Sequence, residues 1–254
     1  MRRSWRLPLF RALILLAFVG LLELLCAVGV IDSLTMPPPP RIAADLWRLL
    51  ASGAFNRAIV HTLTNALIAT AMAMIVGVTA ATLIHRVRPL REAMDLLFST
   101  WYAVPILAFY PLLIVIFGLS SLPSIVIGFM QGVVAVIVTA LDGLDRVPRV
   151  LRKLARTQHM TALETTWLIT LPAAAPWLLS GAKLAIAFSI IGVVASEFLM
   201  AREGMGFEIS YAYNNFDNAR MYPLILLVIL FSVTVNGVLL RWERRLARRR
   251  GLVT

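Results

Sequence analysis

Six polar or ionisable residues interrupt long apolar runs of this sequence, where such side chains are costly. They are Glu23, Gln131, Lys183, Ser189, Ser196 and Glu197. Side chains of this kind commonly pair with one another or line a path for an ion or a solute. Glu23 lies deepest in its run, and Lys183 lies at a similar depth in another. We therefore consider Lys183, on a neighbouring helix, as the partner of Glu23.

A basic stripe marks a long polar segment between two apolar runs, Asp142–Pro172. Its cationic residues are spaced i, i+3, i+4 and i+7, which places them on one face of a helix. They are Arg149, Arg152, Lys153 and Arg156. Another face of the same helix is apolar and carries Val147, Leu151 and Leu154. Such a helix offers its basic face either to a partner protein or to anionic lipid headgroups.

A second short helix is predicted to begin at Thr161, because Thr161 and Glu164 have the spacing of a capping box. Pro172 and Pro176 are expected to end it. Asp142–Pro172 therefore predicts a helix–turn–helix outside the apolar runs. We find no phosphate-binding glycine loop, no paired metal-ligand spacing and no nucleophile motif. The histidines are scattered (His61, His85, His159), and a single cysteine excludes an internal disulfide, so the sequence indicates neither catalysis nor a metal site.

The apolar runs are long enough to cross a bilayer as helices. Hydrophobic residues make up 60% of the 254 residues and charged residues only 15%. We predict an all-α integral membrane protein with six spans: Ala12–Ile31, His61–Ile84, Met94–Leu119 broken at Pro105 and Pro111, Pro123–Leu141, Trp177–Met200 and Tyr222–Leu240. Within these spans Lys183 can instead extend to the interface, and Glu197 can lie among the headgroups.

The remaining segments divide the chain into three parts. Residues 1–60 hold the first span, a proline-rich linker and a short amphipathic helix over Ile42–Leu50, which Ser52 and Gly53 end. Residues 61–241 form a core of five spans, with the loop 142–172 and a polar loop over Ala201–Arg220. Residues 242–254 form a basic tail.

The basic residues are distributed unequally about the spans. Eighteen of the 24 lysines and arginines fall on the side that carries both termini and loop 142–172, and five fall on the other. Because basic loops stay in the cytoplasm, we expect both termini and this loop to be cytoplasmic. The formal net charge of +11 is thereby explained by topology, and no nucleic-acid partner is implied.

Several motifs make the chain similar to a known family. Ala155, Ile169, Leu171 and Pro172 match a cytoplasmic-loop pattern of Glu-Ala-Ala, three residues, Gly, nine residues and Ile-x-Leu-Pro. Further matches are Met36–Pro40, Pro105–Leu112 with Phe117-Gly118, Leu171–Ala185, Val193–Phe198 and Gly204-Met-Gly206. Over residues 12–250 the chain resembles the permease subunits of type I ABC importers, in the nitrate, sulfonate and taurine branch.

The resemblance implies a transport subunit of the bacterial inner membrane that binds no ATP and no cofactor itself. Two permease subunits, expected to be identical, would form a pathway for a small anion such as a sulfonate, taurine or nitrate. A periplasmic or lipid-anchored binding protein would deliver the solute, and two separate ATPase subunits would drive transport. The implied ATPase-coupling residues are Leu154, Ala155, Thr157, His159, Met160, Thr161, Ala162, Glu164, Leu171 and Pro172.

Lys153 and His159 depart from the family pattern, because they stand where it has Glu and Gly. Glycine suits a turn with positive φ, which histidine adopts only at a cost. Either the turn is reshaped, or His159 contacts the ATPase. The alternative to a transporter is an integral-membrane enzyme or scaffold without an ATPase, which the absence of a catalytic constellation disfavours.

Overall fold

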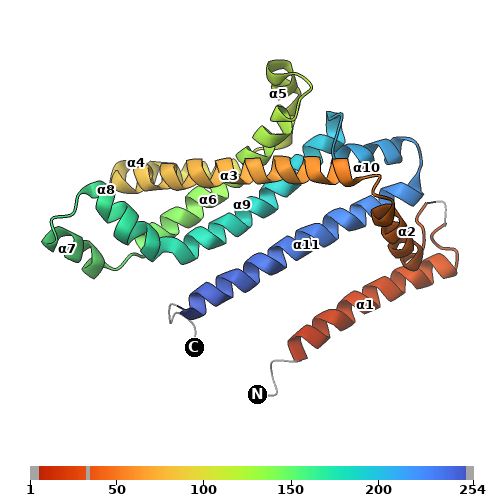
Figure 1. Cartoon of the computed structure of the whole chain (residues 1–254), viewed down its shortest axis with the longest axis horizontal. Helices are drawn as coiled ribbons and strands as arrows, with labels where there is room; N and C mark the ends of the chain where they lie inside the picture. Colours follow the sequence, from red (N-terminus) through yellow and green to blue (C-terminus); the bar gives the residue numbers. More distant parts are fainter. Residues whose placement is uncertain (1–5, 33–34, 250–254) are drawn as a thin grey trace.

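The computed structural model describes residues 6–32 and 35–249, and every regular element in those ranges is a helix (Figure 1). The predicted all-α class is confirmed. In chain order the elements are α1 (Arg6–Ala27), α2 (Pro39–Ser52), α3 (Asn56–Arg86), α4 (Arg88–Trp101), η1 (Ile106–Phe109), α5 (Tyr110–Phe117), α6 (Leu122–Asp145), α7 (Arg149–Thr157), α8 (Ala162–Glu164), η2 (Thr165–Thr170), α9 (Leu171–Met200), α10 (Met205–Asn214) and α11 (Asn218–Arg249).

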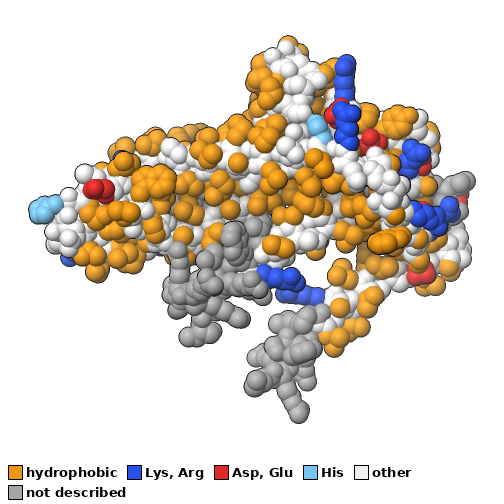
Figure 2. All heavy atoms as spheres, in the orientation of Figure 1, with side chains coloured by type: hydrophobic (Ala, Val, Ile, Leu, Met, Phe, Trp, Pro, Cys, Tyr) orange, Lys and Arg blue, Asp and Glu red, His pale blue; other side chains and the backbone are white. Residues whose placement is uncertain are grey.

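Within the residues that the structure describes, five stretches of helix are long and apolar enough to cross a membrane. They are Leu9–Ala27, Asn56–Arg86, Leu122–Asp145, Ala162–Met200 and Asn218–Val238. A sixth span results if the bent pair formed by α4 with η1 and α5 is counted as one. Figure 2 shows apolar side chains over most of the visible side of this helical body, as expected for a surface that faces lipid.

The centre of the molecule is a bundle of α3, α6 and α9, which pack against one another (Figure 1). Small residues permit the close approach of these helices, as is common within membranes. Ala69, Ala73 and Ala185 are fully buried. A Cβ atom on Gly192 of α9 would lie only 3.0 Å from the Cα atom of Gly128 on α6. The bundle is therefore the tightly packed core of the molecule, and the features described below lie at its two ends and at its middle.

The third apolar run is broken, as its prolines predict. Helix α4 ends at Trp101, and the chain resumes at Ile106 with a bend of 85°. Pro105 directly precedes η1, and Pro111 occupies the first turn of α5, where a missing N–H is tolerated. Helix α5 consequently projects from the body instead of continuing along it (Figure 1).

Helices α1, α2 and α11 lie beside this bundle. The amphipathic helix expected over Ile42–Leu50 is present within α2, which buries Ile42, Leu46 and Leu49 and packs against α11. Gly53 ends α2 with a φ of 67°, a left-handed conformation that suits glycine. Helix α1 packs against α2 and lies on the far side of α11 from α9 (Figure 1).

Two predicted segments differ from the structure. The helix that begins after Thr161 does not end at Pro172 but continues through the π-helical η2 into α9, where Pro172 occupies the first turn and Pro176 lies inside. Pro172 has no N–H to donate, and the π-helical η2 changes the hydrogen-bond spacing directly before it, since the Leu171 N–H donates to the Thr166 carbonyl. The segment expected to be the loop Ala201–Arg220 contains helix α10, whose apolar side packs against α9 and α11.

Candidate functional site

Helices α7 and α8 form a hook at one end of the bundle, called here the α7 end (Figure 1). The hook is the predicted helix–turn–helix. Arg149, Lys153 and Arg156 are exposed on α7, as the basic stripe requires, and the side chain of Arg152 lies outside the described residues. The hook therefore presents positive charge outward at the end of the bundle.

The apolar face of α7 differs by one position from the prediction. Val147, Leu151 and Ala155 face the bundle, with Ala155 only 2% exposed, whereas Leu154 is 49% exposed. Leu151 and Ala155 are spaced four residues apart and so lie on one side of α7, whereas Val147 precedes the helix. The small side chain of Ala155 allows α7 to approach the bundle closely. Leu154 and the 74% exposed Val150 instead add an apolar area to the outer surface.

The predicted capping box at Thr161 is present. The Thr161 N–H donates to Oε2 of Glu164 at 2.7 Å, and the Glu164 N–H donates to Oγ1 of Thr161 at 3.2 Å. These reciprocal bonds satisfy donors that a helix start leaves without partners. The start of α8 is therefore fixed by its own side chains.

The turn between α7 and α8 is built by backbone bonds around His159, which has a φ of 52°. The Met160 N–H donates to the Ala155 carbonyl at 3.0 Å, and the His159 N–H donates to the Arg156 carbonyl at 3.1 Å. These two bonds define a Schellman motif, in which the left-handed residue is usually glycine. The turn is therefore not reshaped by histidine, and the exposed imidazole stands at its tip.

The hook is attached to the bundle through neighbouring helix ends. Arg86, at the end of α3, donates to Oγ1 of Thr166 in η2 at 3.0 Å. Beside this contact, Nδ1 of His85 lies 3.0 Å from Oδ1 of Asp145 and so joins α3 to the end of α6, from which the chain enters the hook. A cavity of about 340 Å³ lies between α3, α7 and η2, and its lining includes Ala155, Met160, Ala162 and Thr170. At the start of α9, Leu171 is half-buried and Pro172 is exposed.

Glu197 organises the opposite end of the bundle, called here the α10 end. Its side chain is 1% exposed, and Oε2 accepts hydrogen bonds from Oγ1 of Thr62 at 2.7 Å and from the Gly206 N–H at 3.2 Å. Thr62 Oγ1 also accepts a bond from the Met205 N–H at 2.7 Å. Nδ1 of His61 lies 3.6 Å from Oε1 of Glu197. Glu197 thus joins α3, α9 and the start of α10.

The glycines of the Gly204-Met-Gly206 motif are required by the close packing around Glu197. Gly204 has a φ of 111°, and a Cβ atom there would lie 2.3 Å from Cδ of Glu197. A Cβ atom on Gly206 would lie 2.3 Å from the carbonyl oxygen of Val194. Each distance is too short for any residue larger than glycine. Nearby on α10, burial raises the pKa of Glu208 above its usual value, and Arg220 partly opposes this rise.

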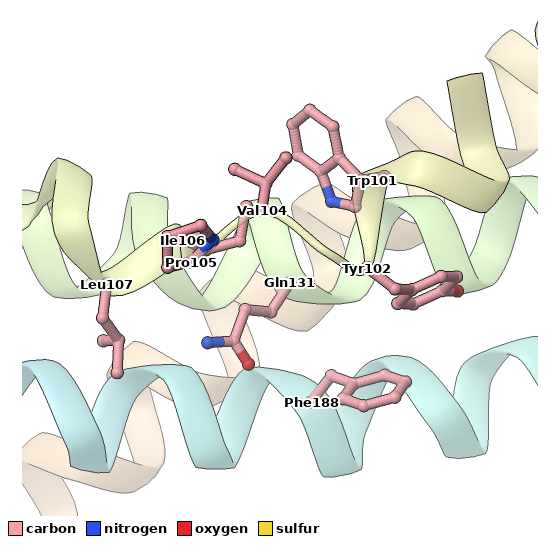
Figure 3. Close-up of a pocket in the computed structure, with 8 residues that line it drawn as sticks. All are labelled: Trp101, Tyr102, Val104, Pro105, Ile106, Leu107, Gln131 and Phe188. Carbon is pink, nitrogen blue, oxygen red and sulfur yellow. The ribbon is translucent and has the colours of Figure 1, made fainter.

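A third feature lies midway between these ends, at the break between α4 and α5. A cavity of about 340 Å³ is lined by the break, by Gln131 of α6 and by Phe188 of α9. Figure 3 shows the Gln131 amide pointing into the space between the break and α9. Gln131, one of the polar residues predicted along a solute pathway, therefore borders a cavity.

The other predicted polar residues occupy different surroundings. Ser189 is buried and donates to the Gly128 carbonyl at 3.1 Å, and Ser196 is buried and donates to the Val193 carbonyl at 2.8 Å. The Ser189 bond joins α9 to α6, and the Ser196 bond lies within α9. Glu23 is exposed on α1, and α11 separates α1 from α9 (Figure 1). The structure therefore keeps Glu23 and Lys183 apart, and their expected pairing is absent within the described chain.

Comparison with known proteins shows which protein family has this arrangement of helices. Residues 73–251 match the family described as a binding-protein-dependent transport system inner membrane component. The chain belongs to this family. The permease is 28% identical over 192 residues to the nitrate import permease NrtB of Leptolyngbya laminosa, a match that covers 76% of the chain and 65% of that relative. It is 26% identical over 223 residues to the taurine permease TauC of Escherichia coli K12, with 83% and 80% covered.

The fold of the permease also matches a solved structure. The MetNI methionine ABC transporter superposes with a TM-score of 0.63 at 18% identity, covering 74% of this chain and 94% of that chain. The predicted type I importer permease fold is confirmed. In the part of the permease that the structure describes, no group of three His, Cys, Asp or Glu side chains could hold a metal ion.

Sequence reasoning missed the partners of Glu197 in this permease. Thr62 precedes Glu197 by 135 residues, and no local spacing connects them. A signal was nevertheless present, because an acidic residue at the end of an apolar run is followed closely by two glycines. A buried carboxylate needs hydrogen-bond donors, and backbone N–H groups beside glycine can approach it closely.

Proposed function

We propose that this permease is the membrane-spanning subunit of an ATP-driven importer and that its α7–α8 hook docks a separate ATPase. The observation that carries the proposal is the hook itself, within a chain of this family. Its two helices are held by a capping box and a Schellman turn, and it exposes both basic and apolar side chains at one end of the bundle. These features support a transporter over a membrane enzyme or scaffold.

The rest of the importer follows from the family. A binding protein, periplasmic or lipid-anchored, would deliver the solute at the α10 end, and a second copy of the permease would complete the pathway. The named relatives are a nitrate import permease and a taurine transport permease, which supports a small anion as the solute. ATP would be bound by the ATPase, and the permease would need no cofactor of its own.

The charge distribution supports an orientation in the bacterial inner membrane with the hook and both termini in the cytoplasm. The N-terminal end of α1 and the C-terminal end of α11 both point toward the side of the molecule on which α7 lies (Figure 1). Exposed cations also lie on that side, on α7, and basic segments are retained in the cytoplasm.

Co-expression with a candidate ATPase subunit tests the proposal. We expect the tagged permease to co-purify with it, and the complex to hydrolyse ATP and import solute in proteoliposomes. Leu154→Glu should abolish co-purification, because it places a charge in the apolar area of the hook. The matched control is Leu119→Glu, also exposed but in the turn between α5 and α6. If the Leu154→Glu variant still co-purifies with the ATPase, the hook is not part of the docking surface.

A further inference from the structure

The cavity between α3, α7 and η2, called here the hook cavity, lies at the depth of the lipid headgroups. On α3 it is lined by Arg86, the last residue of a helix of 31 residues. Such a helix is about 46 Å long at 1.5 Å per residue. The hydrocarbon core of a bilayer is about 30 Å thick, or about 40–45 Å with its headgroup regions. Helix α3 therefore crosses the core and both headgroup regions, and Arg86 at its end lies among the headgroups.

The hook cavity is positively charged. Arg86 and Arg156 line it, and none of its eleven described lining residues is Asp or Glu. His85 also lines it, but Nδ1 of His85 lies 3.0 Å from Oδ1 of Asp145, so the uncompensated charge comes from the two arginines. Arginine is the residue best suited to bind a phosphate group, because its planar guanidinium donates two parallel hydrogen bonds to the phosphate oxygens.

Three of the helical segments around the cavity supply hydrogen-bond donors. Arg86 of α3 uses one of its five N–H groups to donate to Oγ1 of Thr166 at 3.0 Å, which holds its side chain beside η2. The Arg156 guanidinium on α7 makes no hydrogen bond or ion pair with any residue that the structure describes. The hydroxyl of Thr165 in η2 lines the cavity and is likewise unbonded within the described chain. A bound phosphate can therefore accept hydrogen bonds from α3, α7 and η2 together.

The size and the surroundings of the cavity favour a lipid phosphate over a free phosphate ion. The volume of about 340 Å³ equals roughly eleven water molecules at about 30 Å³ each, which leaves room for the glycerol part of a headgroup beside the phosphate. Exposed apolar side chains lie on the same two segments, with Leu83 on α3 57% exposed and Trp167 and Leu168 in η2 65% and 66% exposed. Tryptophan is enriched at the membrane interface, and these side chains can contact acyl chains.

We infer that the hook cavity binds the phosphodiester headgroup of an anionic phospholipid between Arg86 of the bundle and Arg156 of the hook. Basic pockets between membrane helices on the cytoplasmic side are suited to such headgroups, and the proposed orientation places the hook on that side. The bound phosphate ties the hook to the end of α3 through two charged contacts. The inference goes beyond the importer function, because it adds a lipid ligand that restrains the element proposed to dock the ATPase.

Native mass spectrometry of the full-length permease, purified in detergent without an ATPase, tests the site with dioleoylphosphatidylglycerol as the probe. We expect saturable retention of this lipid at concentrations at which phosphatidylcholine, which has no net charge, is not retained. Arg86→Gln and Arg156→Gln should each weaken retention about tenfold or more, because each removes hydrogen bonds to a charged group. Equal retention of the two lipids by the unmodified permease would overturn the site.

Arg88→Gln and Arg149→Gln are the matched controls, because each removes the same charge from a position outside the cavity. Arg88 lies just after Arg86 in the chain, Arg149 lies on the same helix as Arg156, and both controls are exposed. Retention by the control variants should stay within twofold of the unmodified permease. Equal losses from all four variants would show a general attraction of anionic lipid to the basic surface and would overturn the site.

Trp167→Ala and Trp47→Ala test the contact with the acyl chains. Trp167 follows a residue that lines the cavity, whereas Trp47 is 74% exposed on α2. Trp167→Ala should weaken retention several-fold, and Trp47→Ala should leave it unchanged. A large excess of inorganic phosphate should not displace the lipid, because the free ion has no acyl chains. Displacement by phosphate would identify a site for the free ion and overturn the lipid as ligand, as would equal retention by the two tryptophan variants.

These outcomes are distinguishable from failure of the proposed function, because lipid retention is measured without the ATPase. If the ATPase complex assembles but retention does not depend on Arg86 and Arg156, only the lipid site is overturned. If no ATPase complex forms while the retention pattern holds, the importer function fails and the lipid site stands. Size-exclusion profiles identify a variant that does not fold. Arg156→Gln removes no hydrogen bond within the described chain, so this variant decides the question even if Arg86→Gln misfolds.

Discussion

At the scale of single residues, Glu197 stabilises the α10 end through contacts that no other described side chain duplicates there. Its carboxylate holds Thr62 of α3 and the N–H of Gly206 in α10. Thr62 holds the N–H of Met205 in turn. A buried carboxylate that loses such donors keeps its desolvation cost without compensation. The stability of this end should therefore depend on a few atoms.

Thr62→Val should lower the free energy of unfolding by roughly 1–3 kcal/mol, because a buried hydrogen-bonding group is left without its partner. The matched control is Thr70→Val on the same helix. Thr70 is also buried, but its hydroxyl bonds only to the Ala66 carbonyl one turn earlier. Thermal unfolding in detergent measures both. Equal losses from the two variants would show that Glu197 does not depend on Thr62.

Gly206→Ala should destabilise the permease by about 1–3 kcal/mol, the usual cost of overpacking. The added Cβ atom would lie 2.3 Å from the Val194 carbonyl oxygen, and backbone must move to admit it. Gly237→Ala in α11 is the control, because its Cβ atom meets nothing within 4 Å. That control should be neutral or stabilising by up to about 1 kcal/mol. Similar melting temperatures for both variants would contradict the close packing around Gly206.

At the scale of elements, the hook shows what periodicity can and cannot predict. The spacing of Thr161 and Glu164 was sufficient for the capping box, because both partners lie within one turn. The prediction for the inward face of α7 was wrong by one position, because it named Leu154 where the structure buries Ala155. Apolar character favoured Leu154, but the close approach of α7 to the bundle selects the smaller Ala155. The effect of side-chain volume on packing can be predicted only when the opposing surface is known.

Local sequence rules also failed at two other places. They did not predict that α8 continues into α9, and they did not predict α10. Pro172 is a helix breaker in isolation, yet here it begins α9 because η2 shifts the hydrogen-bond register before it. Helix α10 has polar residues that suggested a loop, but tertiary burial of Met205, Ile209 and Ala212 stabilises it. The spans, by contrast, follow from apolar length alone, because a bilayer-sized run has few alternative folds.

His159→Gly tests the turn between these elements. Since His159 has a φ of 52°, glycine should relieve a left-handed strain of roughly 1 kcal/mol, partly offset by the greater entropy of unfolded glycine. We expect unfolding stability unchanged or slightly raised, and ATPase co-purification preserved. Stability is measured by thermal unfolding and assembly by pull-down. A variant that is stable but does not bind the ATPase would show that the imidazole itself contacts the partner.

At the scale of the whole molecule, α3 and α9 connect the two ends directly. Helix α3 carries Thr62 near one end and Arg86 at the other, and these contact Glu197 and Thr166. The span that contains α9 runs from Ala162 to Met200, so α8, the second helix of the hook, belongs to the same continuous helix as Glu197. A displacement of the hook by the proposed ATPase can therefore reach the α10 end through packed helices. The Gln131 cavity lies between these ends.

Cysteine labelling tests the orientation that this coupling requires. In a Cys26→Ala background, Gln158→Cys places a thiol at the hook and Asn214→Cys places one on α10, and both positions are exposed. A membrane-impermeant maleimide should label Gln158→Cys in inside-out vesicles and Asn214→Cys in right-side-out vesicles, because the basic hook is retained in the cytoplasm. Detergent should make both reactive. Labelling of Gln158→Cys in right-side-out vesicles would show the opposite orientation, in which the hook lies outside the cytoplasm and out of reach of ATP.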